Sequence, residues 1–158
     1  MSEPGIVFVC WGNICRSPMA EVVAHAFAAR DGLRGVRFSS AGVSAEEAGN
    51  PMDERAVAAL RAAGYAPGEF RAHRITAEEA EGADMLIGME QLHLSRLRQL
   101  VPHAQHLYLM SDFDRNAVPG SAIEDPWYGD DADFVEALEQ IERAMPEVIK
   151  RARELVHT

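Results

Sequence analysis

The chain has 158 residues, a formal net charge of −10 at pH 7, a hydrophobic fraction of 47% and a charged fraction of 25%. These values are typical of one globular domain, which we expect to span residues 1–158. So acidic a chain is poorly suited to a nucleic acid or an anionic membrane surface as its main partner. We therefore expect no nucleic-acid partner and no membrane partner.

Strand and helix patterns alternate along the chain, which favours an α/β fold with a parallel sheet. The expected strands are short apolar runs, at residues 6–9, 36–38, 85–88 and 106–109. The expected helices lie between and after them, at residues 18–30, 50–64, 76–82, 90–101 and, beyond a long loop over 111–131, the C-terminal segment. This order gives an alternating α/β chain.

Three of these helices carry further sequence signals. Asn50 is expected to cap a helix that has Pro51 in its first turn and Asp53 at an early acidic position. Thr76, followed three residues later by Glu79, predicts a capping box. The last helix contains a proline, Pro146, that predicts a kink. Its buried face is expected to consist of Phe134, Leu138, Ile141, Met145, Ile149 and Ala152.

The segment Cys-Trp-Gly-Asn-Ile-Cys-Arg-Ser-Pro, residues 10–18, connects the first expected strand to a helix. Backbone N–H groups in such a loop can point inward and form an anion site above the helix N-terminus. Arg16 adds a planar fork that can hold two phosphoryl oxygens. The thiolate of Cys10, stabilised in that positive field, is a nucleophile. This arrangement suits covalent catalysis on a phosphate monoester.

A structural interpretation of the same segment has to be weighed. A cysteine that ends an apolar strand is often a small buried hydrophobic residue, and its spacing to Arg16 also occurs by chance. Gly12 and Asn13, however, tolerate positive φ in a tight loop. Ser17 can cap the helix and bond the thiolate of Cys10, and Pro18 fits the first helical turn. These features favour the catalytic interpretation.

The long loop contains a second candidate site, Glu124-Asp125-Pro126-Trp127-Tyr128-Gly129-Asp130-Asp131. The carboxylic acid of Asp125 could protonate a leaving phenolate while Trp127 and Tyr128 hold its flat face. An ordinary surface turn explains this composition equally well. The presence of the Cys10 loop in the same chain favours the functional alternative.

Taken together, these segments make the chain similar to the low-molecular-weight protein tyrosine phosphatases over essentially its whole length. The resemblance rests on residues 10–18, on Ser40-Ala41-Gly42 and on Asp125-Pro126-Trp127-Tyr128. An early cysteine combined with a late Asp-Pro acid is specific to this family. The resemblance implies a four-stranded parallel sheet of order 2-1-3-4 with helices on both faces. It also implies a two-step hydrolysis of phosphate monoesters that needs no metal and no cofactor.

The resemblance implies a role for individual residues. Cys10 would be the nucleophile, Arg16 would bind the transferring phosphoryl group, and Asp125 would act first as acid and then as base. Cys15 would trap an oxidised Cys10 as a reversible disulfide. Ser40 would brace a left-handed Asn13, and Ser17 would stabilise the thiolate. The substrate would meet Trp11, Gly12, Asn13, Ile14, Cys15, Ser17, Trp127 and Tyr128.

Four residues depart from the family pattern. Trp11 is larger than the usual Leu or Thr, and Trp127 replaces the usual Tyr. Phe70 falls where many members carry a loop-bracing His, which leaves open whether His73 substitutes for it. Glu90 takes the place of a usual Asp. We expect these changes to affect substrate preference and the rigidity of the loop.

Three other functions are weighed against phosphotyrosine hydrolysis. An arsenate reductase of this fold needs a distant third cysteine, whereas Cys10 and Cys15 are the only two. A protein arginine phosphatase usually carries a smaller polar residue in place of Ile14. A non-catalytic phosphate-binding module would be expected to lack Cys10, Arg16 or Asp125. The sequence therefore favours hydrolysis of phosphotyrosine in proteins.

The remaining features predict location and partners. The segment Met1-Ser2-Glu3-Pro4 lacks the basic region of a signal peptide, and two close cysteines form no disulfide framework. We expect a cytoplasmic monomer or weak dimer that acts on phosphotyrosine-containing proteins, with secretion by a route without a signal peptide left open. No metal site is expected. No catalytic role is assigned to the histidines, namely His25, His73, His93, His103, His106 and His157.

Overall fold

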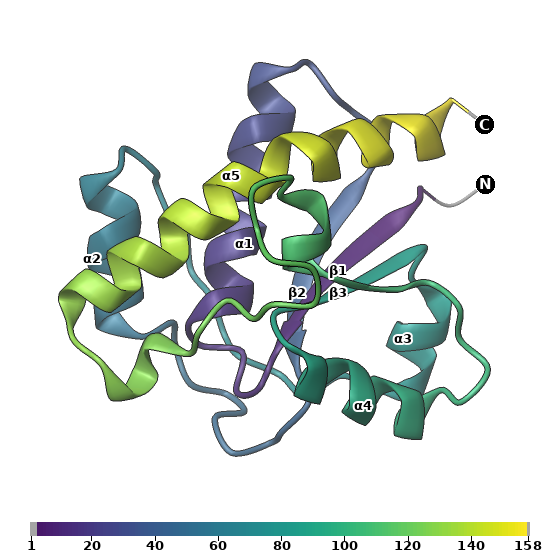
Figure 1. The fold of residues 1–158 in the computed structure, drawn as a ribbon, viewed down its shortest axis with the longest axis horizontal. Coiled ribbons are helices and arrows are strands. Elements are labelled where there is room, and N and C mark those ends of the chain that lie inside the picture. The colour runs from purple at the N-terminus through teal and green to yellow at the C-terminus, as the bar shows by residue number, and fades with distance from the viewer. Residues whose placement is uncertain (1–2, 158) are drawn as a thin grey trace.

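A computed structural model describes residues 3–157 (Figure 1). Met1, Ser2 and Thr158, the ends of the expected domain, lie outside the described residues. One parallel sheet has the order β2-β1-β3-β4. Its strands are β1 (Gly5–Cys10), β2 (Arg37–Gly42), β3 (Met85–Gly88) and β4 (Leu107–Leu109). This confirms the sheet that the sequence predicts.

Helices cover both faces of the sheet, as expected (Figure 1). They are α1 (Arg16–Arg30), α2 (Glu54–Ala62), α3 (Ala77–Gly82), α4 (Gln91–Leu100) and α5 (Asp131–Val156). Successive side chains of a strand point to opposite faces. Ile6 and Phe8 of β1 therefore pack with α1, α2 and α5, while Val7 and Val9 pack with α3 and α4.

The register of the sheet brings the carboxyl ends of three strands to one edge. Cys10, the last residue of β1, pairs with Gly42, the last residue of β2. Val9 pairs with Gly88, the last residue of β3. In open parallel sheets the crevice beyond this edge is where ligands bind, because the loops that leave the strands converge there.

Most helices and strands begin and end within two residues of the bounds predicted from the sequence. The predicted strand at 85–88 is confirmed, and Thr76 caps α3 by accepting a hydrogen bond from the backbone N–H of Glu79 at 3.1 Å. The ladder with β1 continues to Gly42, so β2 is longer than the expected 36–38. The predicted buried face of α5 is confirmed, and Pro146 lies within the continuous helix.

The predicted cap of the next helix is wrong. α2 begins after Asp53, whose carboxylate accepts a hydrogen bond from the backbone N–H of Arg55 at 2.8 Å, and Asn50 lies outside the helix. The backbone N–H of Asp53 donates to the carbonyl of Ile14 at 2.9 Å. In a helix capped by Asn50, this N–H is one that would donate to the Asn50 side chain, because a cap bonds the N–H two or three residues further along. The carbonyl of Ile14 takes that donor instead.

Gly42 allows the end of β2 to approach the loop after β1. A Cβ atom at this position would lie 2.8 Å from the carbonyl oxygen of Trp11 and 3.1 Å from the carbonyl carbon of Gly12. Just beyond it, the backbone N–H of Val43 donates to the carbonyl of Cys10 at 3.0 Å. The absence of a side chain at Gly42 therefore lets β2 support the loop directly. Within residues 3–157, no helix is long and apolar enough to cross a bilayer.

Candidate active site

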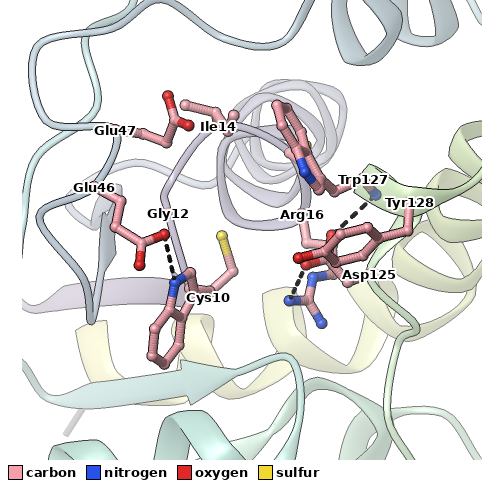
Figure 2. A pocket seen from close by; sticks show the side chains of 11 residues that line it. Cys10, Gly12, Ile14, Arg16, Glu46, Glu47, Asp125, Trp127 and Tyr128 are labelled. Atoms are coloured by element: carbon pink, nitrogen blue, oxygen red, sulfur yellow. Dashed lines mark hydrogen bonds and ion pairs between the residues drawn. The ribbon is translucent and has the colours of Figure 1, made fainter.

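A cavity of about 210 Å³ opens at the carboxyl edge of the sheet (Figure 2). It joins two segments that are far apart in the sequence, the loop after β1 and the Asp-Pro loop before α5. Figure 2 shows the Cys10 sulfur between Glu46 on one side and Asp125 and Tyr128 on the other. The lining residues are Cys10, Trp11, Gly12, Ile14, Cys15, Arg16, Glu46, Glu47, Asp125, Trp127 and Tyr128.

Asn13 holds the loop after β1 in shape. It is fully buried, and its φ of 61° is the one positive value among the described non-glycine residues. Its side-chain amide donates to the hydroxyls of Ser17 at 2.9 Å and Ser40 at 3.1 Å, and its carbonyl accepts from the backbone N–H of His73 at 3.0 Å. These three bonds offset the steric cost of a left-handed asparagine.

The Cys10 thiol lies at the centre of this network. Its sulfur is buried and lies 2.9 Å from the Ser17 hydroxyl, which also lies 3.4 Å from the carbonyl of Ala41. α1 begins at Arg16, so the sulfur lies near the positive end of a helix. A hydroxyl donor and a helix N-terminus both stabilise negative charge on a sulfur atom.

His73 contributes to the loop through its backbone rather than its ring. Its backbone N–H donates to Asn13, while its imidazole lies 2.9 Å from a carboxylate oxygen of Glu79. Phe70, at the position where a bracing His was considered, packs against the core with α1, α2 and α5. His73 therefore contacts the loop through its backbone N–H, and its imidazole does not take the place of the missing His.

Arg16 carries the buried positive charge of the cavity, with its side chain only 1% exposed. Nη1 donates to the carbonyl of Ile123 at 2.8 Å and lies 3.4 Å from a Glu90 oxygen. Nη2 lies 3.4 Å from an Asp125 oxygen. Among the described residues, Nε of Arg16 is the one buried side-chain nitrogen or oxygen without a hydrogen-bond partner. Leaving a buried donor unpaired costs about 1–3 kcal/mol, so this atom favours a bound acceptor.

His93 is a residue of the site that the sequence analysis missed. It is fully buried, and its Nε2 lies 3.5 Å from Nη2 of Arg16 and 3.5 Å from an oxygen of Glu90. Burial and, secondly, the charge of Arg16 lower the pKa of His93 to about 3. The one signal in the sequence is the Glu-x-x-His spacing at the start of a helix that follows a central strand.

Asp125 lies at the mouth of the cavity on a short loop. It caps one turn of 3₁₀ helix (Pro126–Tyr128): one carboxylate oxygen accepts from the backbone N–H of Trp127 at 3.1 Å, and the other faces Arg16. Trp127 is half-exposed and Tyr128 is 90% exposed. The loop therefore presents a carboxyl group and two aromatic rings to the same opening, as Figure 2 shows.

Arg55 fastens this loop to α2, a contact that the sequence did not reveal. Its guanidinium donates to the backbone carbonyls of Trp127 and Gly129, each at 3.3 Å. It also lies over the rings of Trp127 at 5.5 Å and Phe134 at 4.5 Å, and Asp53 holds its other side at 3.1 Å. Cation–π contacts and charge-assisted bonds together restrain the loop.

Trp11 forms the opposite rim. Its indole N–H donates to a Glu46 oxygen at 3.2 Å, and the Arg96 guanidinium lies 5.0 Å from the centre of its ring. Glu46 and Glu47 line the cavity although no sequence pattern marked them. The mouth therefore carries carboxylates on both sides, with Asp125 on the far side.

Cys15 is a buried free thiol in the same loop. Burial raises its pKa most, and the charges of Asp53, Cys10 and Asp125 raise it further. Cys15 therefore stays protonated near neutral pH. In the described part of the chain, no group of three or more His, Cys, Asp or Glu side chains is placed to hold a metal ion.

The Asn13 network makes a prediction about stability. Asn13→Ala loses three hydrogen bonds and keeps a strained φ, so we expect it to lower the free energy of unfolding by about 3 kcal/mol. Asn13→Gly loses the same three hydrogen bonds, but glycine adopts a positive φ without strain. We therefore expect its free energy of unfolding to fall by about 1 kcal/mol less than that of Asn13→Ala. Urea denaturation measures both, with Asn50→Ala as an exposed control. Equal losses for Ala and Gly would show that the left-handed backbone adds no strain.

The family model for low molecular weight phosphotyrosine protein phosphatase matches residues 5–157. Low molecular weight protein-tyrosine phosphatase A of Mycobacterium tuberculosis is 42% identical over 149 residues, covering 92% of this chain and 90% of the relative. The crystal structure of YfkJ from Bacillus subtilis has a TM-score of 0.90 and 27% identity, covering 98% and 97% of the two chains. The YwlE arginine phosphatase has a TM-score of 0.82 and 26% identity, covering 96% and 99%. The chain therefore belongs to the low molecular weight phosphotyrosine protein phosphatase family.

Proposed function

We propose that the chain hydrolyses phosphotyrosine in proteins through a cysteinyl-phosphate intermediate, with Cys10, Arg16 and Asp125 as catalytic residues. The observation that carries the proposal is the buried Arg16, which lines the same cavity as Cys10 and Asp125 and whose Nε has no hydrogen-bond partner. A guanidinium in this state binds two oxygens of a phosphoryl group through Nε and a terminal nitrogen. Family membership supports the same activity.

In the first step, the Cys10 thiolate attacks phosphorus. The S–P bond forms while the bond from phosphorus to the tyrosine oxygen breaks, and Asp125 gives its proton to the leaving phenolate. Arg16 and the loop N–H groups stabilise the charge on the three equatorial oxygens. The phosphoryl oxygens replace Asp125 as the partner of Arg16 Nη2, which releases the carboxyl group toward the leaving oxygen.

In the second step, water replaces the sulfur. The carboxylate of Asp125 takes a proton from the attacking water, a new P–O bond forms, and the S–P bond breaks. The Ser17 hydroxyl, 2.9 Å from the sulfur, donates to the thiolate as it leaves. Inorganic phosphate departs, and each group returns to its starting protonation state. Both steps use only side chains of this chain.

The rim supports an aromatic substrate. Ile14 is buried and lines the opening together with three aromatic residues, Trp11, Trp127 and Tyr128. A phenyl ring that fills this opening brings its phosphate to the sulfur of Cys10. The side chains of phosphoserine and phosphothreonine are shorter, and phosphoarginine places a guanidinium beside an apolar Ile14. Phosphotyrosine proteins are therefore the proposed substrates.

We also propose that Cys15 protects the nucleophile against oxidation. A peroxide converts the Cys10 thiolate to a sulfenic acid, and the Cys15 thiol condenses with it to a disulfide with release of water. Both cysteines are buried in one loop, and a negative charge on Cys10 helps to raise the pKa of Cys15. Because burial raises the pKa of Cys15, this thiol stays protonated and does not compete with Cys10 as the nucleophile.

Substrate preference tests the proposal. The kcat/KM for a phosphotyrosine peptide is expected to exceed that for the matched phosphoserine peptide by about 10²-fold or more, because a displacement near 1 Å costs about that factor. Phosphoarginine is expected to be a poor substrate. Activity is expected to survive EDTA and to vanish in Cys10→Ser. Equal values for tyrosine and serine, or a lead for arginine, would contradict the phosphotyrosine assignment.

The role of Asp125 as the acid can be tested with aryl phosphates whose leaving phenols differ in acidity. Asp125→Asn is expected to slow the hydrolysis of phenyl phosphate about 10²–10⁴-fold, the usual contribution of a positioned acid. The loss is expected to shrink as the phenol becomes more acidic, since such groups leave without a proton. Asp131→Asn, an exposed neighbour, serves as the control. A uniform loss across all leaving groups would assign the proton to another residue.

A further inference from the structure

We propose that His93 is a positioning residue: its neutral imidazole holds the Glu90 carboxylate, and through it the Arg16 guanidinium, in the orientation that phosphoryl binding requires. The proposal rests on the proposed function. It concerns a fully buried group that the two catalytic steps do not use. His93 acts through Glu90 and does not touch the substrate.

Two backbone donors fix the tautomer of His93. The N–H groups of Met89 and Glu90 both donate to Nδ1, at 3.1 Å and 3.2 Å. Nδ1 is therefore an acceptor without a proton, and a neutral imidazole then carries its proton on Nε2. The pKa of about 3 keeps the ring neutral at any pH at which the enzyme is expected to work. His93 thus presents one fixed N–H donor.

Two polar groups lie near this donor: Nε2 is 3.5 Å from Glu90 Oε1 and 3.5 Å from Arg16 Nη2. Two N–H groups cannot bond each other, so of these two neighbours only the carboxylate can accept from the imidazole N–H. The same Glu90 oxygen lies 3.4 Å from Arg16 Nη1. Glu90 Oε1 therefore lies between two donors, one from His93 and one from Arg16.

The contact with His93 helps to fix the side chain of Glu90. Its side chain is 28% exposed and has one more rotatable bond than an aspartate, so it loses more conformational entropy when it is fixed. The Glu-x-x-His spacing places both side chains on the first turn of α4. Gly88 makes room for the side chains of His93 and Leu94: a Cβ there would lie 3.1 Å from the Cβ of His93 and 3.1 Å from Leu94. The end of β3 is thus shaped to accept the imidazole.

Two substitutions separate the nitrogens of His93. In His93→Asn the amide oxygen takes the place of Nδ1 and keeps the two backbone bonds, but no donor reaches Glu90. In His93→Gln the amide nitrogen takes the place of Nε2 and keeps the donor, while the backbone bonds are lost. We expect His93→Asn to keep its melting temperature and to lose about 10- to 100-fold in kcat, because small displacements of catalytic groups have effects of this size.

His93→Gln is expected to melt at a lower temperature and to keep most of its kcat. A purely structural role predicts the opposite order, with activity following stability, and that result would overturn the proposal. In a protein that already carries Glu90→Gln, His93→Asn is expected to cause no further loss of kcat. If the losses of kcat from the two substitutions multiply, the proposal is overturned. His103→Asn, an exposed histidine, is the control. Failure of the proposed function would appear separately, as absence of aryl phosphate turnover by the wild-type enzyme.

Discussion

Burial of one positive charge is the constraint on which the site depends. Removing a guanidinium from water costs several kcal/mol unless it is paired and hydrogen-bonded. Arg16 meets this demand in part, through the carbonyl of Ile123 and the carboxylates of Glu90 and Asp125. Its Nε has no partner. In the proposed reaction, a phosphoryl group supplies the missing acceptor and two negative charges. The burial of Arg16, which lowers the stability of the free protein, then strengthens the binding of phosphate.

The scaffold holds this charge by bringing distant segments to one edge of the sheet. β1 delivers the loop with Cys10 and Asn13, β2 supports that loop through Gly42, and α4, which follows β3, places Glu90 and His93 behind Arg16. Each support contacts the loop or Arg16 rather than the cavity itself. The carboxyl group of Asp125 is less tightly held than the loop of residues 10–18, since it is 34% exposed at the mouth and has two partners, the guanidinium of Arg16 and the backbone N–H of Trp127. We infer that a rigid binding loop is combined with an acid that changes partner when phosphate binds.

The sequence predicts features that lie within one contiguous segment better than contacts between segments that are far apart in the chain. Residues 10–18 place a cysteine, an arginine and a helix start in one contiguous segment, so the sequence indicates them together, and the strand at 85–88 is confirmed to the residue. The expectation that Ser17 caps the helix is wrong, because α1 begins at Arg16 and the Ser17 hydroxyl contacts Cys10 and Asn13 instead. Asn50 was wrongly predicted as a cap because the competing bond, from Asp53 to Ile14, is tertiary. His93 is one histidine in a helix, and only the fold shows that Arg16 lies beside it. Arg55, Glu46 and Glu47 escaped prediction for the same reason.

The central claim is that phosphate passes through a covalent bond to Cys10. An Asp125→Asn variant mixed with an aryl phosphate of a very acidic phenol can complete the first step but lacks the base for the second, so the intermediate is expected to accumulate. Rapid denaturation and mass spectrometry then measure the protein. The account predicts a gain of one phosphoryl group, located on Cys10 and absent in a variant that also carries Cys10→Ala, which has no nucleophilic atom at this position. Release of phosphate with Cys10 unmodified throughout, or a phosphoryl group on another residue, would contradict the account.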